Sequence, residues 1–364
     1  MSKTLVKLGD VCIKDSSNIA QKDLINLEGL YPIYGASGFI KNINQFNQDK
    51  PYVAIVKDGA GVGRAMYLPA YSSVIGTLQY ILPKDSIDSK YLFYAISFMD
   101  LTKYAKGATI PHIYFKEYKE ELLNLPDLET QQKIVAKLDN LNLAIDKCKR
   151  LLELHDELIK SKFYEMFGDP VVNEKGWEVY NFEDITEIIT DGEHSTPKRT
   201  ERGIYLLSAR NVLNHSLTFD DVDYIDEDEY NRISKRIIPQ NGDILLSCSG
   251  TVGRCCSVKS NIKFQMVRSV ALLRFNSAIN PIFAEYLITS DELQNQIKSS
   301  STKTAQANLF QGKIKKLKGF VPPLQLQTQF AQYVETVETS KTKIKELQSR
   351  IEYLKASYMQ EYFA

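Results

Sequence analysis

The glycine-rich segment Gly59-Ala60-Gly61-Val62-Gly63 has the residue types of a loop that cradles a phosphate. A phosphate-binding loop must open a helix whose N-terminus faces the anion. Here the next residues, Arg64 to Pro69, have the pattern of a strand, and the lysine and hydroxyl residue of a P-loop are absent. The sequence therefore predicts a tight turn that lets backbone approach a ligand, not a nucleotide site.

Asp191, His194 and Ser195 are the residue types of a hydrolase triad. Because the last two are adjacent, the imidazole cannot easily face its neighbour's hydroxyl as a base, and no Gly-x-Ser-x-Gly elbow surrounds the serine. We expect these residues to form a loop with hydrogen-bonding side chains.

Enzymes that modify or cut DNA are also disfavoured. Val321-Pro322-Pro323-Leu324 lacks the Asp or Asn that precedes the two prolines of an adenine methyltransferase, and Pro126-Asp127 is followed by no Glu-x-Lys of a magnesium-dependent nuclease. The four histidines are scattered, and the five cysteines have no paired metal-binding spacing. We predict a binding protein with no catalytic residue, no metal and no cofactor.

The elements that carry these residues occur twice. The segment from Leu125 to Gln132 returns as Val321 to Thr328, displaced by 196 residues (Pro126 to Pro322), and Gly61-Val62-Gly63-Arg64 returns as Thr251-Val252-Gly253-Arg254. Repetition over so long a period indicates duplication of a whole module rather than a solenoid. Leu8 to Val11 and Phe182 to Ile185 are expected to be equivalent first strands.

Each module is predicted to end in a long helix. In the first, Ile134, Leu138, Leu141, Ile145, Cys148, Leu152, His155 and Ile159 alternate at four and three residues, which is the seam of a coiled coil. This helix would run from a cap at Asp127 or Thr130 to about Phe167, roughly 55 Å, more than one turn of B-DNA at about 34 Å. The seam expected for the second helix is Phe330, Val334, Val337, Ile344, Ile351, Leu354 and Tyr358, interrupted by Lys341. Two such helices should pair antiparallel.

Further elements are expected inside the modules. A helix is predicted from Ser89 to Leu101, and buried strands are predicted at Tyr52 to Val56, Ile244 to Ser247 and Val270 to Phe275.

Composition favours a protein without a membrane segment. The chain has 364 residues, 43% of them hydrophobic, and no apolar run of the roughly 18 residues that a membrane span needs. With no signal peptide pattern at the N-terminus, a cytoplasmic location is expected. The formal net charge is zero, which argues against binding nucleic acid by electrostatics alone. An acidic stretch at 220–229 precedes a basic one at 232–274; this is either a solvated surface or a local phosphate-binding face.

Several motifs together resemble the specificity subunit of type I restriction-modification systems. Tyr31-Pro32-Ile33-Tyr34-Gly35-Ala36-Ser37-Gly38 with Asp58 to Arg64 resembles one form of its target recognition domain. Asp191 to Pro197, Ser208-Ala209-Arg210-Asn211-Val212 and Gly242 to Ser247 resemble another. The two Pro-x-Leu-x-x-Gln helix openings fit as well, although Asp127 stands where the family usually has a second proline.

The resemblance implies an α+β fold with two tandem target recognition domains, each followed by a long helix, the two helices pairing as an antiparallel coiled coil. The domains would span residues 1–125 and 169–321, and the spacer helices 126–168 and 322–364. It also implies that each domain reads one half of a split, asymmetric site in double-stranded DNA. Two methyltransferase subunits, and two restriction subunits, would be its protein partners.

Loop residues that follow the predicted turns are the candidate DNA contacts. In the first module they are Lys57, Arg64, Lys106, Thr109 and His112. In the second they are Arg210, Asn211, Ser249, Thr251, Arg254, Lys303, Thr304, Gln306 and Asn308. Arginine at such a place can reach a phosphate or a guanine edge. Two other functions stay open: a stand-alone DNA-binding regulator, and a coiled-coil scaffold with protein-binding ends.

Overall fold

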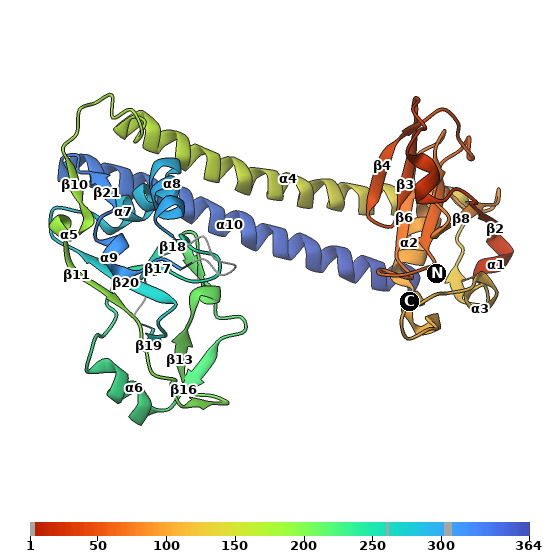
Figure 1. Cartoon of the computed structure of the whole chain (residues 1–364). Helices are drawn as coiled ribbons and strands as arrows, with labels where there is room; N and C mark the ends of the chain where they lie inside the picture. Colours follow the sequence, from red (N-terminus) through yellow and green to blue (C-terminus); the bar gives the residue numbers. More distant parts are fainter. Residues whose placement is uncertain (1–3, 260–261, 302–307) are drawn as a thin grey trace. The chain divides into compact units, whose positions relative to one another are not determined.

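The computed structural model describes residues 4–259, 262–301 and 308–364 (Figure 1). It divides into two compact units, unit 1 with residues up to 150 and from 344 to 364, and unit 2 with residues 151–343. Each of the long helices α4 (Leu128–Phe167) and α10 (Leu324–Phe363) has one part in unit 1 and the other part in unit 2. The two units therefore do not coincide with the four segments expected from the sequence. Among the described helices, none is both long and apolar enough to span a lipid bilayer.

Unit 1 is built on an antiparallel sheet with the strand order β2-β8-β5-β6. A second sheet, β4-β3-β7, pairs β3 and β7 in parallel. The central strand β5 is buried along its whole length, which explains its uninterrupted apolar sequence. The elements before α4 are β1 (Leu5–Lys7), α1 (Leu8–Val11), β2 (Cys12–Ser16), η1 (Gln21–Leu24), β3 (Tyr31–Gly35), β4 (Gly38–Ile43), β5 (Tyr52–Val56), β6 (Ala65–Leu68), β7 (Ser73–Val74), β8 (Leu78–Pro83), α2 (Ser89–Phe98), η2 (Leu101–Tyr104), α3 (Phe115–Tyr118) and β9 (Leu122–Asn124).

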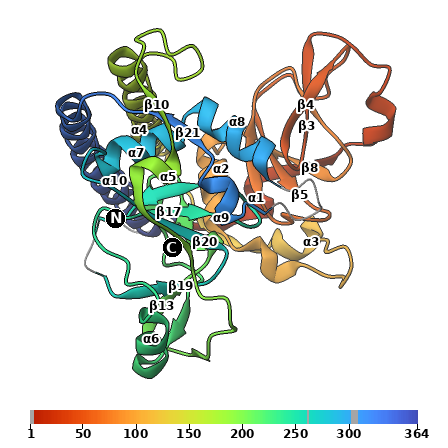
Figure 2. The ribbon, with the colours of Figure 1, turned by 60° about the vertical axis from the view of Figure 1, so that its left-hand side comes forward.

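Unit 2 repeats this plan with the antiparallel sheet β11-β20-β17-β18. Its second sheet, β12-β16-β13-β19, again contains one parallel pair, β13 with β19, and α6 lies beside β19 (Figure 2). The elements before α10 are β10 (Val179–Asn181), α5 (Phe182–Ile185), β11 (Thr186–Asp191), β12 (Arg199–Thr200), β13 (Ile204–Leu207), η3 (Ala209–Asn211), β14 (Val212–Leu213), β15 (Ser216–Leu217), β16 (Asp223–Ile225), α6 (Glu227–Ser234), β17 (Ile244–Ser247), β18 (Cys255–Ser257), β19 (Phe264–Met266), β20 (Val270–Phe275), α7 (Pro281–Ile288), α8 (Asp291–Ser300), α9 (Gln311–Ile314) and β21 (Lys318–Phe320).

The shared strand order confirms the duplication. In both units a short antiparallel pair, β1 with β9 or β10 with β21, joins the start of the unit to the segment before its long helix. Both long helices begin and end 196 residues apart, as the sequence repeat predicts. The prediction of equivalent first strands at Leu8 to Val11 and Phe182 to Ile185 was wrong, because these segments are the single helical turns α1 and α5. Their buried residues, Leu8 and Val11 or Phe182 and Ile185, are spaced by three, which suits a helical turn and not a strand.

The halves of α4 and α10 pack against each other within each unit (Figure 1). In unit 1, Lys137 donates a hydrogen bond to the Tyr362 hydroxyl at 3.1 Å and lies 3.6 Å from the centre of the Tyr358 ring. In unit 2, His155 contacts Ser340 through a 3.1 Å hydrogen bond, and the Phe163 ring packs edge-on against Phe330. Residue numbers fall along α10 as they rise along α4 in this pair of contacts, so the segments in unit 2 are antiparallel.

The seam of α10 contains Lys341, as expected, and differs from the expected seam at Leu354. Lys341 stays on the inward face, only 12% exposed, because its ammonium group binds Asp156 at 2.5 Å and Glu338 at 2.7 Å. Burial disfavours the charged lysine, but these two hydrogen bonds outweigh it and raise the pKa of Lys341. Leu354 was wrongly placed on the seam, since it is 41% exposed. The half-buried position is Lys355, which continues the four-three spacing from Ile351.

A buried glutamine in its first turn anchors α4 to unit 1. The Gln131 side-chain carbonyl accepts a hydrogen bond from the Asp88 backbone N–H at 2.7 Å, and its amide donates to the Ser86 and Pro126 carbonyls at 3.1 and 2.8 Å. Asp88 is itself the N-cap of α2. Asp127 caps α4 by accepting from the Thr130 N–H, so the helix starts normally without the second proline.

Gln327 makes the same three contacts in unit 2. Its side-chain carbonyl accepts from the Asn280 N–H at 2.8 Å, and its amide donates to the Ala278 and Pro322 carbonyls at 3.0 and 2.7 Å. Asn280 is the N-cap of α7. Both glutamines are fully buried. The glutamine of the repeated Pro-x-Leu-x-x-Gln motif is thus a structural anchor that fixes each long helix on its globular part.

Replacing this anchor should destabilise its unit. Gln327→Ala would leave one backbone N–H and two carbonyls without their partner in a dry site, so we expect the free energy of unfolding to fall by about 2–4 kcal/mol. Urea denaturation measures the loss. The matched control is Gln325→Ala, on the exposed face of the same helical turn, which should change stability by less than about 0.5 kcal/mol. Equal effects of the two substitutions would contradict the anchor.

Candidate nucleic-acid interface

In unit 1, backbone hydrogen bonds gather several loops where β5 ends. The Lys57 N–H donates to the Thr77 carbonyl at 3.0 Å, and the Lys57 carbonyl accepts from Ile113 at 3.0 Å. Gly59 donates to the Pro111 carbonyl at 2.9 Å. The three glycines of the predicted turn have φ angles of +83°, +84° and +88°, which residues with side chains rarely adopt. The tight turn expected after β5 is therefore confirmed.

Unit 2 gathers the equivalent loops where β17 ends. The Cys248 N–H donates to the Ser269 carbonyl at 2.8 Å, and the Cys248 carbonyl accepts from Leu309 at 2.9 Å. Ser249 and Asn308 form a backbone bridge next to this pair. The same strand ends therefore bring together one loop cluster in each unit: 57–64 with 106–113 in unit 1, and 248–254 with 308–309 in unit 2.

An arginine at the end of each turn holds a third loop in the cluster. Arg64 donates from its guanidinium to the Ala36 carbonyl, and Arg254 donates to the Ala209 carbonyl at 2.8 Å. The loops that carry these alanines differ in sequence, yet each follows the strand of its second sheet that pairs in parallel, β3 or β13. The two unlike motifs thus occupy equivalent places.

The predicted contact residues of unit 1 lie in this cluster and have local partners. Lys57 is 3.7 Å from Asp58, whose carboxylate also hydrogen-bonds the His112 ring at 3.1 Å. Lys106 forms an ion pair with Glu117. Thr109 is exposed. Whether these residues and Arg64 contact DNA stays a prediction.

In unit 2 the predicted residues other than Asn211 fall into three groups. Arg210 is exposed on η3 and pairs with Asp221 at 3.6 Å and Asp223 at 3.3 Å. Four more lie in the loop cluster described above, and their contact with DNA stays a prediction: Ser249, Thr251, Arg254 and Asn308. Three lie outside the described residues: Lys303, Thr304 and Gln306.

Asn211 does not fit its predicted role as a direct contact. Its side chain is only 1% exposed. The side-chain carbonyl accepts from the backbone N–H of Ser208 at 3.0 Å, and the amide donates to the Thr218 carbonyl at 3.3 Å. These bonds close the base of the hairpin after η3, so Asn211 shapes the loop and is not free to reach a base.

Asp191, His194 and Ser195 form hydrogen-bonded loop contacts, as expected. His194 lies 3.3 Å from the Asp191 carboxylate, whereas the Ser195 hydroxyl donates to Glu193. The serine therefore has a carboxylate partner and not the imidazole of a triad. Within the described ranges, no three His, Cys, Asp or Glu side chains are grouped as metal ligands.

Arg268 lies in the loop cluster of unit 2 and was not among the predicted contacts. It lies just before β20, in the same loop cluster as Ser249 and Asn308. The hydrogen-bond register aligns it with Gly76 of unit 1, an offset of 192 residues that neither sequence repeat showed. Only the pairing of the strands reveals the equivalence.

Comparison with known proteins identifies the family. Residues 3–155 and 174–353 match the model of the type I restriction modification DNA specificity domain, once for each unit. The chain belongs to this family.

Relatives and solved structures of the family resemble the chain over most of its length. The MjaVIII specificity subunit of Methanocaldococcus jannaschii is 22% identical over 347 residues, 86% of this chain and 80% of that protein. The EcoBI specificity subunit of Escherichia coli is 23% identical over 270 residues, 66% of this chain and 56% of that protein. An S subunit structure from M. genitalium aligns with a TM-score of 0.64 at 16% identity, covering 100% of this chain and 96% of that one. A chain from a study of type I complex assembly and conformational transition aligns with a TM-score of 0.58 at 16% identity, covering 99% and 97%.

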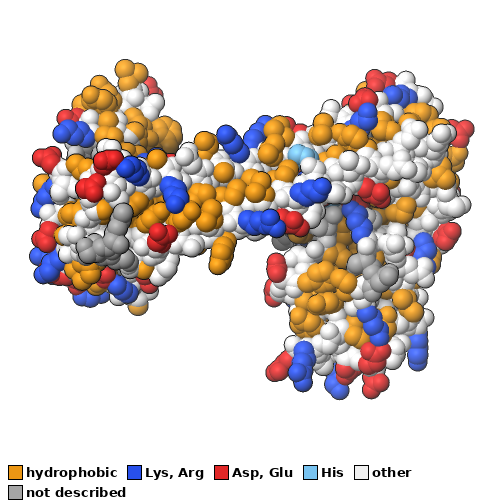
Figure 3. All heavy atoms as spheres, turned by 180° about the vertical axis from the view of Figure 1, so that it is seen from behind, with side chains coloured by type: hydrophobic (Ala, Val, Ile, Leu, Met, Phe, Trp, Pro, Cys, Tyr) orange, Lys and Arg blue, Asp and Glu red, His pale blue; other side chains and the backbone are white. Residues whose placement is uncertain are grey.

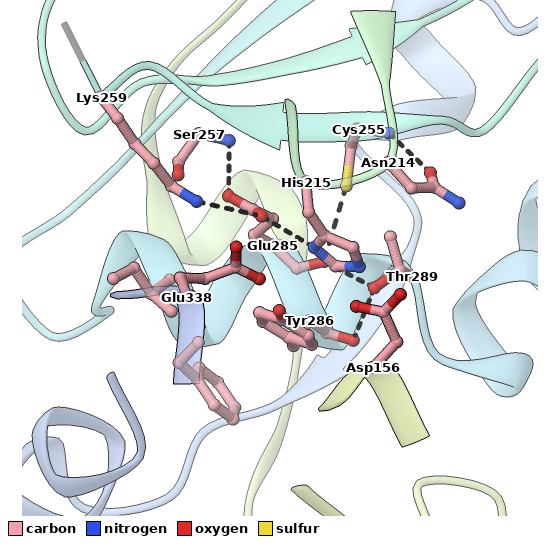
Figure 4. Close-up of polar contacts among 12 residues, drawn as sticks. Asp156, Asn214, His215, Cys255, Ser257, Lys259, Glu285, Tyr286, Thr289 and Glu338 are labelled. Carbon is pink, nitrogen blue, oxygen red and sulfur yellow. Dashed lines mark hydrogen bonds and ion pairs between the residues drawn. The ribbon is translucent and has the colours of Figure 1, made fainter. Parts of the chain in front are cut away.

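In this family member a buried carboxylate, Glu285, supports the loop cluster of unit 2. Figure 4 shows Glu285 of α7 meeting the His215 ring at 2.7 Å and the Ser257 N–H at 2.6 Å, with Lys259 at 3.6 Å. His215 is in the turn between β14 and β15, and β14 directly follows η3. The equivalent position in unit 1 is Phe93, by the same offset of 192 residues. Glu285 thus links the β14–β15 hairpin, which follows Arg210 in the chain, to α7.

The pKa of Glu285 follows from these contacts. Complete burial alone would raise it, but the His215 hydrogen bond and the Lys259 charge outweigh burial and hold the pKa below the ordinary glutamate value of 4.5. The carboxylate therefore adds stability that is fully present above pH 4.5 and is lost as the pH falls through the lower, folded-state pKa.

Glu285→Gln should remove this contribution. The amide keeps the shape but not the charge, so we expect the free energy of unfolding at pH 7 to fall by about 1.5–3 kcal/mol. The acid-induced loss of stability should also become shallower, because one group with a lowered pKa is gone. Urea denaturation between pH 3 and pH 7 measures both effects. Glu201→Gln, in an exposed turn of the same unit, is the control. A variant as stable as the control would contradict a charged Glu285.

Proposed function

We propose that the chain is the DNA-recognition subunit of a type I restriction-modification complex in the cytoplasm, and that each unit reads one half of a split, asymmetric DNA site. The observation that carries this proposal is the repeated loop cluster. The same backbone contacts build it at the end of β5 and of β17, but the side chains differ between the two. A shared scaffold with different side chains suits two half-sites of different sequence.

The charge distribution fits a DNA-binding subunit that depends on partner subunits for contacts with the phosphates. The formal net charge is zero, and Figure 3 shows basic and acidic side chains interspersed over one face. In the loop clusters, Lys57 and Lys106 are paired with carboxylates, and Arg64 and Arg254 bind backbone carbonyls. Neutralisation of many phosphates by this chain alone is therefore not expected, and sequence reading must come from base contacts and from basic surfaces of partner subunits.

The long helices offer a surface for those partners. Several large hydrophobic side chains of α4 and α10 are between 41% and 79% exposed, and Figure 3 shows hydrophobic groups along the helices: Leu143, Leu151, Leu154, Leu158, Leu347, Tyr353 and Leu354. Exposed apolar groups of this size are typical of binding surfaces. We propose that two methyltransferase subunits dock here and supply catalysis, with two restriction subunits joining them, and that this chain provides no catalytic group.

Co-expression with the adenine methyltransferase subunit of its own system tests the function. The expected result is a complex that copurifies, and adenine methylation at a motif of two short sequences separated by unspecified bases. Single-molecule sequencing of DNA from cells with and without this chain measures the motif. Binding to DNA without such a subunit would favour a stand-alone regulator, and binding to neither would favour a scaffold.

The two helices are proposed to set the distance between the half-sites. Inserting one heptad after Arg150 in α4 and one after Lys343 in α10 keeps both seams in register and adds about 10 Å of helix, or about three base pairs. We expect the unspecified spacer to lengthen by about three bases while both half-sites stay the same. The heptad in α4 alone should abolish methylation, because the seams no longer match. An unchanged spacer in the double insertion would contradict the proposal.

A further inference from the structure

An open cleft in unit 2 lies between the ends of its sheet strands. It has a volume of about 420 Å³, and its polar lining includes Asp191, His194, Ser249, Arg268 and Asn308. Asp191 ends β11, and Arg268 lies just before β20, so the strands of the main sheet position both side chains. The cleft is part of the loop cluster assigned above to DNA.

Backbone contacts hold Arg268 firmly in this cleft. Its N–H donates to the Glu193 carbonyl at 2.9 Å, and the Glu193 N–H donates to the Met266 carbonyl at 2.8 Å. The carbonyl of the neighbouring Ser269 accepts a hydrogen bond from the Cys248 N–H at 2.8 Å. The Ser269 hydroxyl accepts one from the Ala209 N–H at 3.0 Å. Arg268 therefore sits at a junction of three loops, and its backbone position is fixed before any ligand arrives.

The Arg268 side chain is exposed, and within the part of the chain that the structure describes its guanidinium has no hydrogen-bond or ion-pair partner. Arg210 and Arg254 differ from it, since the first is paired with two aspartates and the second with a carbonyl. Asp191 lines the same cleft, but it pairs with His194 at 3.3 Å. Arg268 thus has a fixed backbone and a guanidinium whose five donors are not taken up by any described residue.

We propose that Arg268 reads a guanine in the half-site bound by unit 2. A guanidinium fork matches the O6 and N7 acceptors of guanine in the major groove. A phosphate is the poorer partner here, because the Asp191 carboxylate in the same cleft would repel it. A base edge carries no net charge and avoids that repulsion. The inference rests on the proposed function of the chain.

The equivalent position of unit 1 lacks this group. Gly76 donates its N–H to the Ile19 carbonyl at 2.8 Å, as Arg268 does to Glu193, so the two backbones match. A Cβ at Gly76 would meet no atom closer than 3.4 Å, so packing does not require a glycine. The difference between Gly76 and Arg268 therefore gives the two units different donors at one place in the same scaffold.

The test measures the methylation motif and DNA affinity of Arg268→Ala in complex with the methyltransferase subunit. We expect one guanine of one half-site to become unspecified, with a loss of discrimination of roughly 5- to 150-fold at that position and no change in the other half-site. Arg268→Lys keeps the charge but not the fork, so it should also lose most of the discrimination. Arg202→Ala, an exposed arginine beyond the opposite end of β13, is the control and should keep the motif.

Two results would overturn the inference. One is an unchanged motif in folded Arg268→Ala. The other is uniform weakening on all sequences with a shallower salt dependence, rescued by Arg268→Lys, which is the signature of a phosphate contact. If the unaltered chain directs no methylation at a two-part site, the proposed function itself fails; if it does and Arg268→Ala keeps the motif, only the role of Arg268 fails.

Discussion

A buried glutamine at the start of each long helix is the interaction on which each unit depends. Gln131 and Gln327 each satisfy one backbone N–H and two carbonyls in a dry site, and the N–H belongs to the capping residue of α2 or α7. The glutamine therefore fixes the long helix, the shorter helix and the sheet on which that helix packs as one body. Because the same sheet ends in the loop cluster, the anchor also determines how the helix is oriented toward the interface.

Duplication followed by divergence explains the rest of the molecule. The strand order, the turn after β5 or β17 and the arginine that holds the third loop are shared between the units. The units differ in their second sheets, since unit 2 has a fourth strand, the β14–β15 hairpin and α6. They also differ at single positions: Arg268 stands where unit 1 has a glycine, and Glu285 stands where unit 1 has Phe93. Buried polar groups of this kind fix one loop conformation, because leaving them unpaired is costly. Recognition can thus change while the scaffold stays the same.

The sequence was most informative where it repeats. The limits of both long helices, the α4 seam and the glycine turn could be predicted, because each depends on local spacing. Helical turns at Leu8 and Phe182 were mistaken for strands, because four residues carry too little periodicity. Asn211 was predicted to contact DNA, but its side chain binds residues three and seven positions away, across the base of a hairpin. The residue type alone did not indicate this hairpin. Arg268 was not predicted as a contact, because neither sequence repeat aligns it with Gly76. That equivalence follows only from how the strands pair.

Photo-crosslinking of the complete complex to its methylated site tests the account most directly. A crosslinking residue placed at Thr109 in unit 1, or at Thr251 in unit 2, would sit in the loop cluster of its own unit. The account predicts that Thr109 marks bases of one half-site and Thr251 marks bases of the other, with no exchange between them. Crosslinks from both positions to the same half-site, or to the unspecified spacer alone, would contradict the reading of one half-site by each unit.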